Sequence, residues 1–162
     1  MNDLLARAIA AHGGLERWNT FNKVTATVVA GGGLKPMKGL EDDHNPRERT
    51  VTLHEETTFI SSFGQPDWRM AFTPDRVAIE TITGAIVSER SDPRASFAGH
   101  VLETVWDLLH RAYFNGYARW TYLTTQFLMA MPDFEVTEIA PWQEGGEFWR
   151  GLRAVSRRDR QP

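Results

Sequence analysis

The sequence predicts an α+β fold, in which a strongly curved antiparallel sheet (a half-barrel) is covered by an N-terminal helix and by a helical hairpin near residues 101–131. Two observations predict this class. Apolar residues repeat at helical spacing near the N-terminus and again beyond residue 101. Between residues 23 and 90 they alternate with polar residues instead, as in strands with one buried face. The 162 residues, 41% of them hydrophobic, suffice for a domain with its own core.

The first expected helix covers residues 3–12. Its apolar residues fall on one side and are Leu4, Leu5, Ala8 and Ile9. Asn2 or Asp3 can cap its first amides, and Gly13 with Gly14 can end it in the left-handed conformation. A short helical turn at 15–18 follows.

About six strands are expected between residues 23 and 90. Each run is short, rich in β-branched or aromatic residues, and closed by Gly, Pro or Asn. The connections are too short for parallel crossovers, so the strands must be antiparallel. One face of this sheet is expected to be apolar.

Helical spacing returns after the loop at 91–100. Two apolar faces are separated by Asn115 and Gly116, which predicts a hairpin of two helices rather than one long helix. Two more strands are expected at 134–139 and 147–155. Residues 1–156 are therefore assigned to a single half-barrel-like domain, and 157–162 to a disordered basic tail.

Composition excludes several classes of function. The net charge of −3 gives no overall attraction for nucleic acid, and the absence of cysteine excludes disulfides and thiolate metal sites. No run is long and apolar enough for stable membrane insertion. Charges at Asp3 and Arg7 interrupt the apolar start, so no signal peptide is expected and the chain as given is assigned to the cytoplasm. A mis-assigned start would make a periplasmic location the alternative.

One pair of residues could support catalysis. Asp107 and His110 are three residues apart on an expected helix, where a carboxylate can orient or charge an imidazole. His100 is a further ligand if a metal takes part. No nucleophile is placed beside them, so a small hydrolase or metal-assisted enzyme is kept as an alternative, without a catalytic residue or cofactor assigned.

Aromatic residues form the most unusual cluster in the chain, with six of them between residues 113 and 127. Helices with aromatic side chains on several sides must contact apolar surface on several sides. Such helices either belong to an ordinary packed core or close a cavity above a strongly curved sheet. In the second interpretation the ligand-binding wall residues are Trp68, Met70, Phe72, Trp106, Tyr113, Tyr117 and Trp120.

Several motifs resemble known proteins. The start AAHGGLERW (10–18), followed by a strand at 23–26, resembles that of the lipoprotein-carrier (LolA/LolB-like) half-barrel superfamily. The segments DPRASFAGH (92–100), WDLLHRAYFNGYA (106–118) and PWQEGG (141–146) look more closely like a group of bacterial proteins without a known activity. The resemblance implies non-covalent binding of an acyl or similar ligand. It also implies further strands after the helical hairpin, so the chain looks like a shortened copy.

The leading hypothesis is therefore a non-enzymatic protein that binds or carries an apolar, lipid-like ligand in the concave face of a half-barrel. The enzyme described above is one alternative. The other is a structural or partner-binding fragment that pairs with another chain, or with its own copy, through an open sheet edge.

Overall fold

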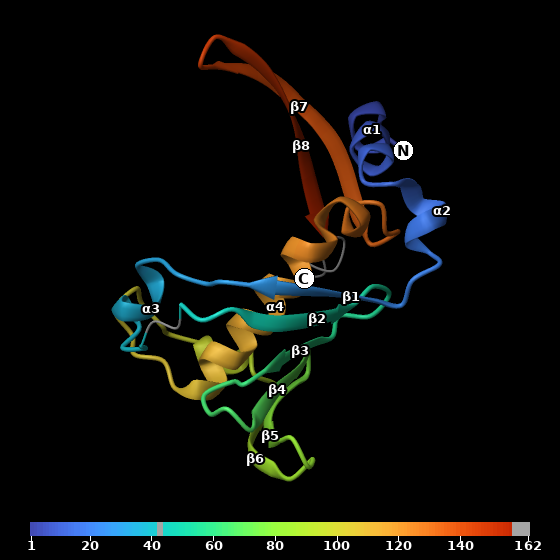
Figure 1. Ribbon diagram of the computed structural model, residues 1–162. Helices are drawn as coiled ribbons and strands as arrows, with labels where there is room; N and C mark the ends of the chain where they lie inside the picture. Colours follow the sequence, from blue (N-terminus) through green and yellow to red (C-terminus); the bar gives the residue numbers. More distant parts are fainter. Residues whose placement is uncertain (42–43, 157–162) are drawn as a thin grey trace. The chain divides into compact units, whose positions relative to one another are not determined.

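The computed structural model describes residues 1–41 and 44–156, and these form two compact units (Figure 1). The larger unit is Asn22–Leu123, and the smaller unit combines Met1–Phe21 with the segment that starts at Thr124. The predicted basic tail at 157–162 lies outside the described residues. The assignment of 1–156 to one domain stays a prediction.

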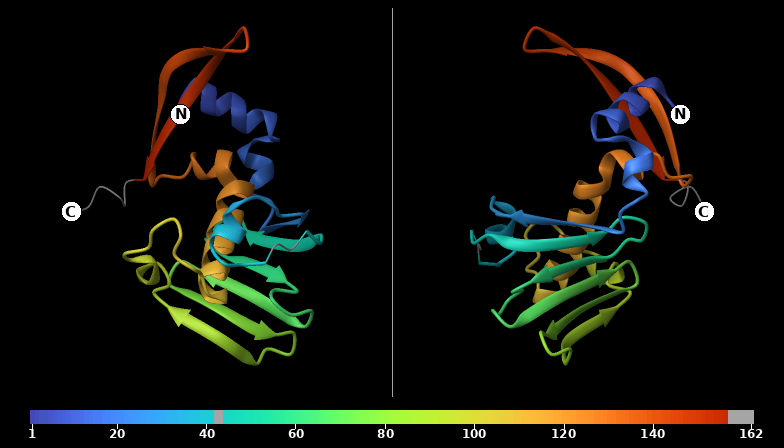
Figure 2. Two further views of the ribbon diagram at one scale, coloured as in Figure 1. Left: turned by 90° about the vertical axis from the view of Figure 1, so that its left-hand side faces the viewer. Right: turned by 45° about the vertical axis from the view of Figure 1, so that its right-hand side comes forward.

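The larger unit contains the predicted antiparallel sheet. Six strands follow one another as a meander in the order β1-β2-β3-β4-β5-β6, and all neighbours are antiparallel (Figure 2). The strands are β1 Lys23–Val28, β2 Arg47–Thr52, β3 Thr58–Ser61, β4 Trp68–Thr73, β5 Arg76–Thr81 and β6 Ile86–Ser91. The α+β class and the six strands are thus confirmed. Two short helices, α3 (Leu34–Met37) and η1 (Ala95–Phe97), lie in connections where none was predicted.

The predicted helical hairpin is wrong. Residues 108–128 form one continuous helix, α4 (Leu108–Leu128), and residues 101–107 are not helical. Asn115 does not break α4, because its side-chain amide donates to the Arg111 carbonyl one turn earlier (2.8 Å). Gly116 allows α4 to pack directly on the sheet, since a Cβ atom there would overlap the Phe72 side chain. The residue pair that suggested a break thus includes a point of close contact between α4 and the sheet.

This close approach organises the core of the larger unit. Thr58 on β3 is fully buried and donates its hydroxyl proton to the Gly116 carbonyl (2.8 Å). Sheet residues and the start of α4 then pack into one cluster, which contains Ile60, Phe63, Met70, Phe72, Val77, Ile79, Leu109 and Ala112. Burying large apolar side chains in this way contributes about 1.5–3 kcal/mol each to folding.

The smaller unit consists of α1 (Asp3–Ala11), α2 (Gly14–Trp18), the end of α4, and a hairpin of β7 (Phe134–Glu144) and β8 (Glu147–Ser156). Asn2 caps α1 as predicted, accepting from the amides of Leu4 (2.8 Å) and Leu5 (3.3 Å). The core of this unit is Leu5, Ile9 and Phe127, with Val136 and Leu152 of the hairpin packed against it. Through this core α1 packs against the β7–β8 hairpin, and its predicted position over the curved sheet stays a prediction. The two C-terminal strands are confirmed, and β7 is longer than predicted.

In the part of the chain that the structure describes, none of the helices combines the length and apolar character needed to cross a membrane.

Replacing Gly116 with alanine should destabilise the larger unit, although alanine is the better helix former by about 1 kcal/mol. The added methyl group overlaps the Phe72 ring, and overpacking of this kind costs about 1–3 kcal/mol. Urea unfolding measures the change. Gly33→Ala is the matched control, because Gly33 has φ −70° and open space around its Cβ position. An unchanged or higher unfolding midpoint for Gly116→Ala would show that the close approach is absent.

Candidate functional site

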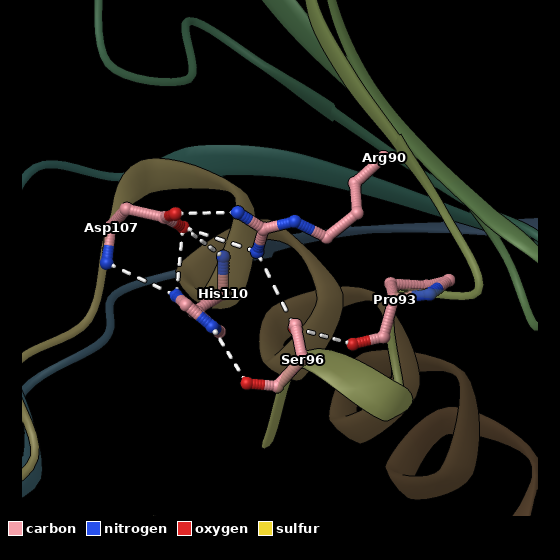
Figure 3. Close-up of polar contacts among 5 residues, drawn as sticks. All are labelled: Arg90, Pro93, Ser96, Asp107 and His110. Carbon is pink, nitrogen blue, oxygen red and sulfur yellow. Dashed lines mark hydrogen bonds and ion pairs between the residues drawn. The ribbon is translucent and has the colours of Figure 1, made fainter. Parts of the chain in front are cut away.

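A polar cluster joins the start of α4 to strand β6 (Figure 3). Asp107 is the N-cap of α4, since its Oδ1 accepts from the backbone amide of His110 at 2.8 Å. Its Oδ2 accepts from Nη2 of Arg90 at 2.6 Å, which ties β6 to the helix. The carboxylate therefore caps the helix and also forms an ion pair between strand β6 and the start of α4.

The environment of Asp107 favours its charged form. Partial burial acts to raise the pKa of Asp107, but the hydrogen bonds from Arg90 and from the His110 amide outweigh it. Together with the nearby positive charges they hold the pKa below its ordinary value. Asp107 is thus an anion that remains half exposed at the surface.

His110 is held by its neighbours at both ring nitrogens. Nδ1 lies 2.8 Å from Oδ1 of Asp107 and is also within 3.2 Å of the Asp107 amide, which can donate to it. Nε2 lies 3.3 Å from the carbonyl oxygen of Ser96. A ring with its proton on Nε2 donates to that carbonyl, and its unprotonated Nδ1 accepts from the Asp107 amide.

The geometry does not form a catalytic Ser-His-Asp arrangement. The Ser96 hydroxyl donates to the Pro93 carbonyl at 2.6 Å and lies 3.4 Å from Nη1 of Arg90. His110 faces the Ser96 carbonyl oxygen, not its hydroxyl (Figure 3). A general base must reach the proton that it removes, and here that proton is directed to Pro93.

His100 lies beside His110, with ring centroids 5.0 Å apart, and the Phe97 ring packs against both. Within residues 1–41 and 44–156, no group of three or more His, Asp or Glu side chains is placed to hold a metal ion. The structure therefore brings the three predicted polar residues together at the start of α4. Asp107 and His110 are hydrogen-bonded there, and His100 contributes ring contacts with Phe97 and His110.

An apolar hollow of about 280 Å³ opens beside this cluster. It lies between strands β4 to β6 and the first turn of α4. We call it the apolar hollow, and it is lined by Trp68, Ile79, Val87, Ser88, Asp107, Leu108 and Leu109. Most of its wall is hydrocarbon, and Asp107 and Ser88 are the polar groups that a bound molecule could contact.

A β-bulge in strand β6 shapes one wall of the apolar hollow. Ile79 pairs with Ser88 and Glu80 pairs with Ile86, so Val87 is the extra residue between them. A bulge of this kind bends a strand and redirects the side chain at the irregular position. Val87 and Ser88 both line the hollow as a result.

A second, smaller hollow of about 90 Å³ has a cationic lining. Lys35, Arg111 and Arg119 lie around it with the aromatic rings of Trp106 and Phe114. Nearby, the buried Lys38 donates to the Val101 carbonyl (2.9 Å) and lies 5.2 Å from the Trp106 ring centre.

The structure distributes the predicted wall residues over several environments. Met70 and Phe72 are core residues beneath α4, and Tyr113 packs edge-on against Phe72 at 5.5 Å. Trp120 is buried, and its indole N–H lies 2.9 Å from the carbonyls of Thr52 and Glu55.

The other three wall residues lie apart from one another. Tyr117 is 52% exposed, Trp106 lines the cationic hollow, and Trp68 lines the apolar hollow. The remaining apolar lining was missed, because Ile79, Val87, Leu108 and Leu109 carry no chemical signature in the sequence beyond ordinary apolar periodicity.

Comparison of the chain with protein-family models, with curated proteins and with solved structures gave no match.

The Asp107 carboxylate should make the fold sensitive to acid. Its pKa is lower in the folded protein, so its stabilisation is complete above the unfolded-state pKa of about 4 and is lost as the pH falls through the folded value. The Asp107→Asn variant keeps a capping side chain without the charge. Urea unfolding should therefore give a stability deficit at about pH 6 that shrinks towards about pH 3.

Asp107→Ala is the companion variant, because it removes the cap as well as the charge. It should cost about 1 kcal/mol more than Asp107→Asn at both pH values. A deficit for Asp107→Asn that stays constant with pH would contradict the ion pair with Arg90.

Proposed function

We propose that the larger unit binds a small apolar ligand in the apolar hollow, without covalent chemistry. The single observation that carries this proposal is the hollow itself, an open space of about 280 Å³ with a mostly hydrocarbon wall beside a fixed carboxylate. Sites for small molecules are typically concave and apolar with a few placed polar groups.

The dimensions of the hollow limit the ligand. Pockets for drug-sized molecules occupy roughly 300–1,000 Å³, so this hollow fits a short acyl chain or a small ring system better than a complete lipid. Removing apolar ligand surface from water supplies roughly 25 cal/mol per Å². We infer that the apolar part of the ligand lies between the side chains of Trp68 and Leu108.

The polar end of the ligand is expected to carry a hydrogen-bond donor. Asp107 is ionised, and an ionised carboxylate only accepts hydrogen bonds. Its oxygens already accept from Arg90 and the His110 amide, but the side chain is half exposed and each oxygen has two acceptor sites. A hydroxyl, amide or amine group at the rim would therefore be favoured over a second carboxylate.

The half-barrel stays an expectation about the curvature of the sheet. A sheet curved away from α4 at strand β6 would leave space at that edge while the centre is filled by Met70 and Phe72. The bulge at Val87 supports such local bending. The relationship to lipoprotein carriers remains a proposal of the same kind, and the hollow at the sheet edge replaces the central cavity that the aromatic cluster suggested.

N-phenyl-1-naphthylamine, a neutral apolar fluorophore with one N–H donor, is a suitable probe. Wild-type protein should bind it saturably with an increase in emission. The Val87→Trp variant fills the hollow with an indole ring and should weaken binding about tenfold or more, as steric filling of a pocket removes the ligand's contacts.

The matched control is Ile86→Trp, which adds an indole to the same edge strand at an exposed residue that does not line the hollow. Its affinity should equal that of wild type, and near-ultraviolet circular dichroism should confirm that both variants are folded. No saturable binding to wild type, or equal binding by the folded Val87→Trp variant, would reject the proposal.

A further inference from the structure

The outer half of the β7–β8 hairpin is exposed on both of its faces. Phe148 is 77% exposed and Trp149 47%, and Ile139 and Trp142 on β7 are exposed to a similar degree. Trp142 and Trp149 are directly paired across the hairpin, so their rings share one face. Ile139 and Trp142 approach Gly151 on that face, where an added Cβ would lie 2.9 and 2.8 Å from them.

Only the base of the hairpin is supported by the core of its own unit. Val136 and Leu152 pack against the cluster of Leu5, Ile9 and Phe127, whereas residues 142–149 have no place in that cluster. Two-stranded hairpins are marginally stable in water, and three or more strands with an apolar face are needed for independent stability. Within the described residues, β7 and β8 form a sheet of two strands only.

The two edges of this small sheet differ in their capacity to pair. Strand β7 carries Glu135, Glu138 and Glu144 without a basic residue, and Pro141 has no backbone N–H to donate. A copy of β7 would add further carboxylates and no cation to this edge. Strand β8 contains no proline and carries both signs of charge, with Glu147 at one end and Arg150 and Arg153 further along.

Two-fold symmetry limits how β8 could pair with its own copy. The axis must stand perpendicular to the sheet, so opposed residues point to the same face and their residue numbers must add up to an even number. Glu147 can face Arg153 of the second copy under this condition, but it cannot face Arg150. The register centred on residue 150 is therefore the one that places opposite charges directly across the interface.

We propose that a second copy of this chain pairs antiparallel with the β8 edge over residues 147–153, centred on Arg150. This pairing forms a continuous four-stranded sheet. Glu147 meets Arg153 of the second copy twice by symmetry, which also offsets the repulsion between the directly opposed Glu144 and Glu147 in each hairpin. Arg150 of one copy faces Arg150 of the other, and the positive charge of each is compensated by its own Glu138, which lies 2.6 Å from it.

The same register places the exposed aromatic residues of β8 against the second copy. Trp149 lies opposite Gly151 of the second copy, beside the Trp142 ring that already covers that glycine in its own hairpin. Phe148 lies opposite Leu152 of the second copy. Large aromatic side chains at glycine positions are a favourable arrangement across strands, and they extend the apolar face of each hairpin.

Sedimentation equilibrium on the whole chain tests the proposal by charge reversal. Wild type should be in monomer–dimer equilibrium. Glu147→Arg and Arg153→Glu alone each place like charges opposite one another twice, and each should weaken the dimer about tenfold or more. The double variant with both changes should restore the wild-type association, and Glu144→Arg on the outer strand should leave the dimer intact.

Several outcomes would overturn the proposal. A strictly monomeric wild type rules out the second copy as the occupant of this edge. Species larger than a dimer would instead indicate head-to-tail pairing between β8 and β7. A dimer that persists in both single variants, or a double variant that fails to regain association, would exclude this register.

Cysteine cross-linking tests the register directly, because the chain contains no cysteine. Residue 150 faces its own copy, and opposed Cα atoms in an antiparallel pair are about 4.5–5.5 Å apart, within the range of a disulfide. Arg150→Cys should therefore form a disulfide-linked dimer under mild oxidation, and Phe148→Cys should not. The reverse result would reject the centre at Arg150. Both experiments use residues of the smaller unit, so their outcome is independent of ligand binding in the larger unit.

Discussion

The contact between Gly116 and Phe72 is the constraint on which the larger unit depends. A helix can lie this close to a sheet only where it carries no side chain, and the Gly116 carbonyl accepts a hydrogen bond from the buried Thr58 at the same point. The close approach lets Leu109 and Ala112 enter the core on one side of Gly116. It also fixes where α4 begins relative to strand β6, since Asp107 reaches Arg90 from there.

A consequence of this packing is that the space between the centre of the sheet and α4 is filled. Met70, Phe72 and Ile79 are fully buried, so the centre of the sheet forms part of the hydrophobic core. Space remains at the edge, where the bulge at Val87 leaves the regular register. The polar cluster of Asp107, Arg90 and His110 holds the start of α4 at a fixed distance from the edge strand β6.

The smaller unit meets a different constraint. Its helices and the base of the hairpin share a core in which Trp18 and Phe127 stack at 3.9 Å, but the outer hairpin extends beyond that core. Exposed aromatic residues on both faces are costly for a free strand pair. The unequal edges, one acidic and interrupted by Pro141 and the other of mixed charge, determine which strand can accept a neighbour.

The sequence by itself determined the α+β class, the six antiparallel strands, the Asn2 cap and the two C-terminal strands, because these depend on local periodicity and turn chemistry. Only the tertiary structure decided whether Asn115 and Gly116 end a helix or continue it, since the answer depends on Phe72, a residue far away in the sequence. The same holds for the candidate site. Asp107 and His110 were visible as a pair, but their hydrogen-bond partners on β6 and at Ser96 made them a support for α4. The apolar hollow was hidden because its walls are ordinary apolar side chains, and only the fold determines which of these are left partly uncovered.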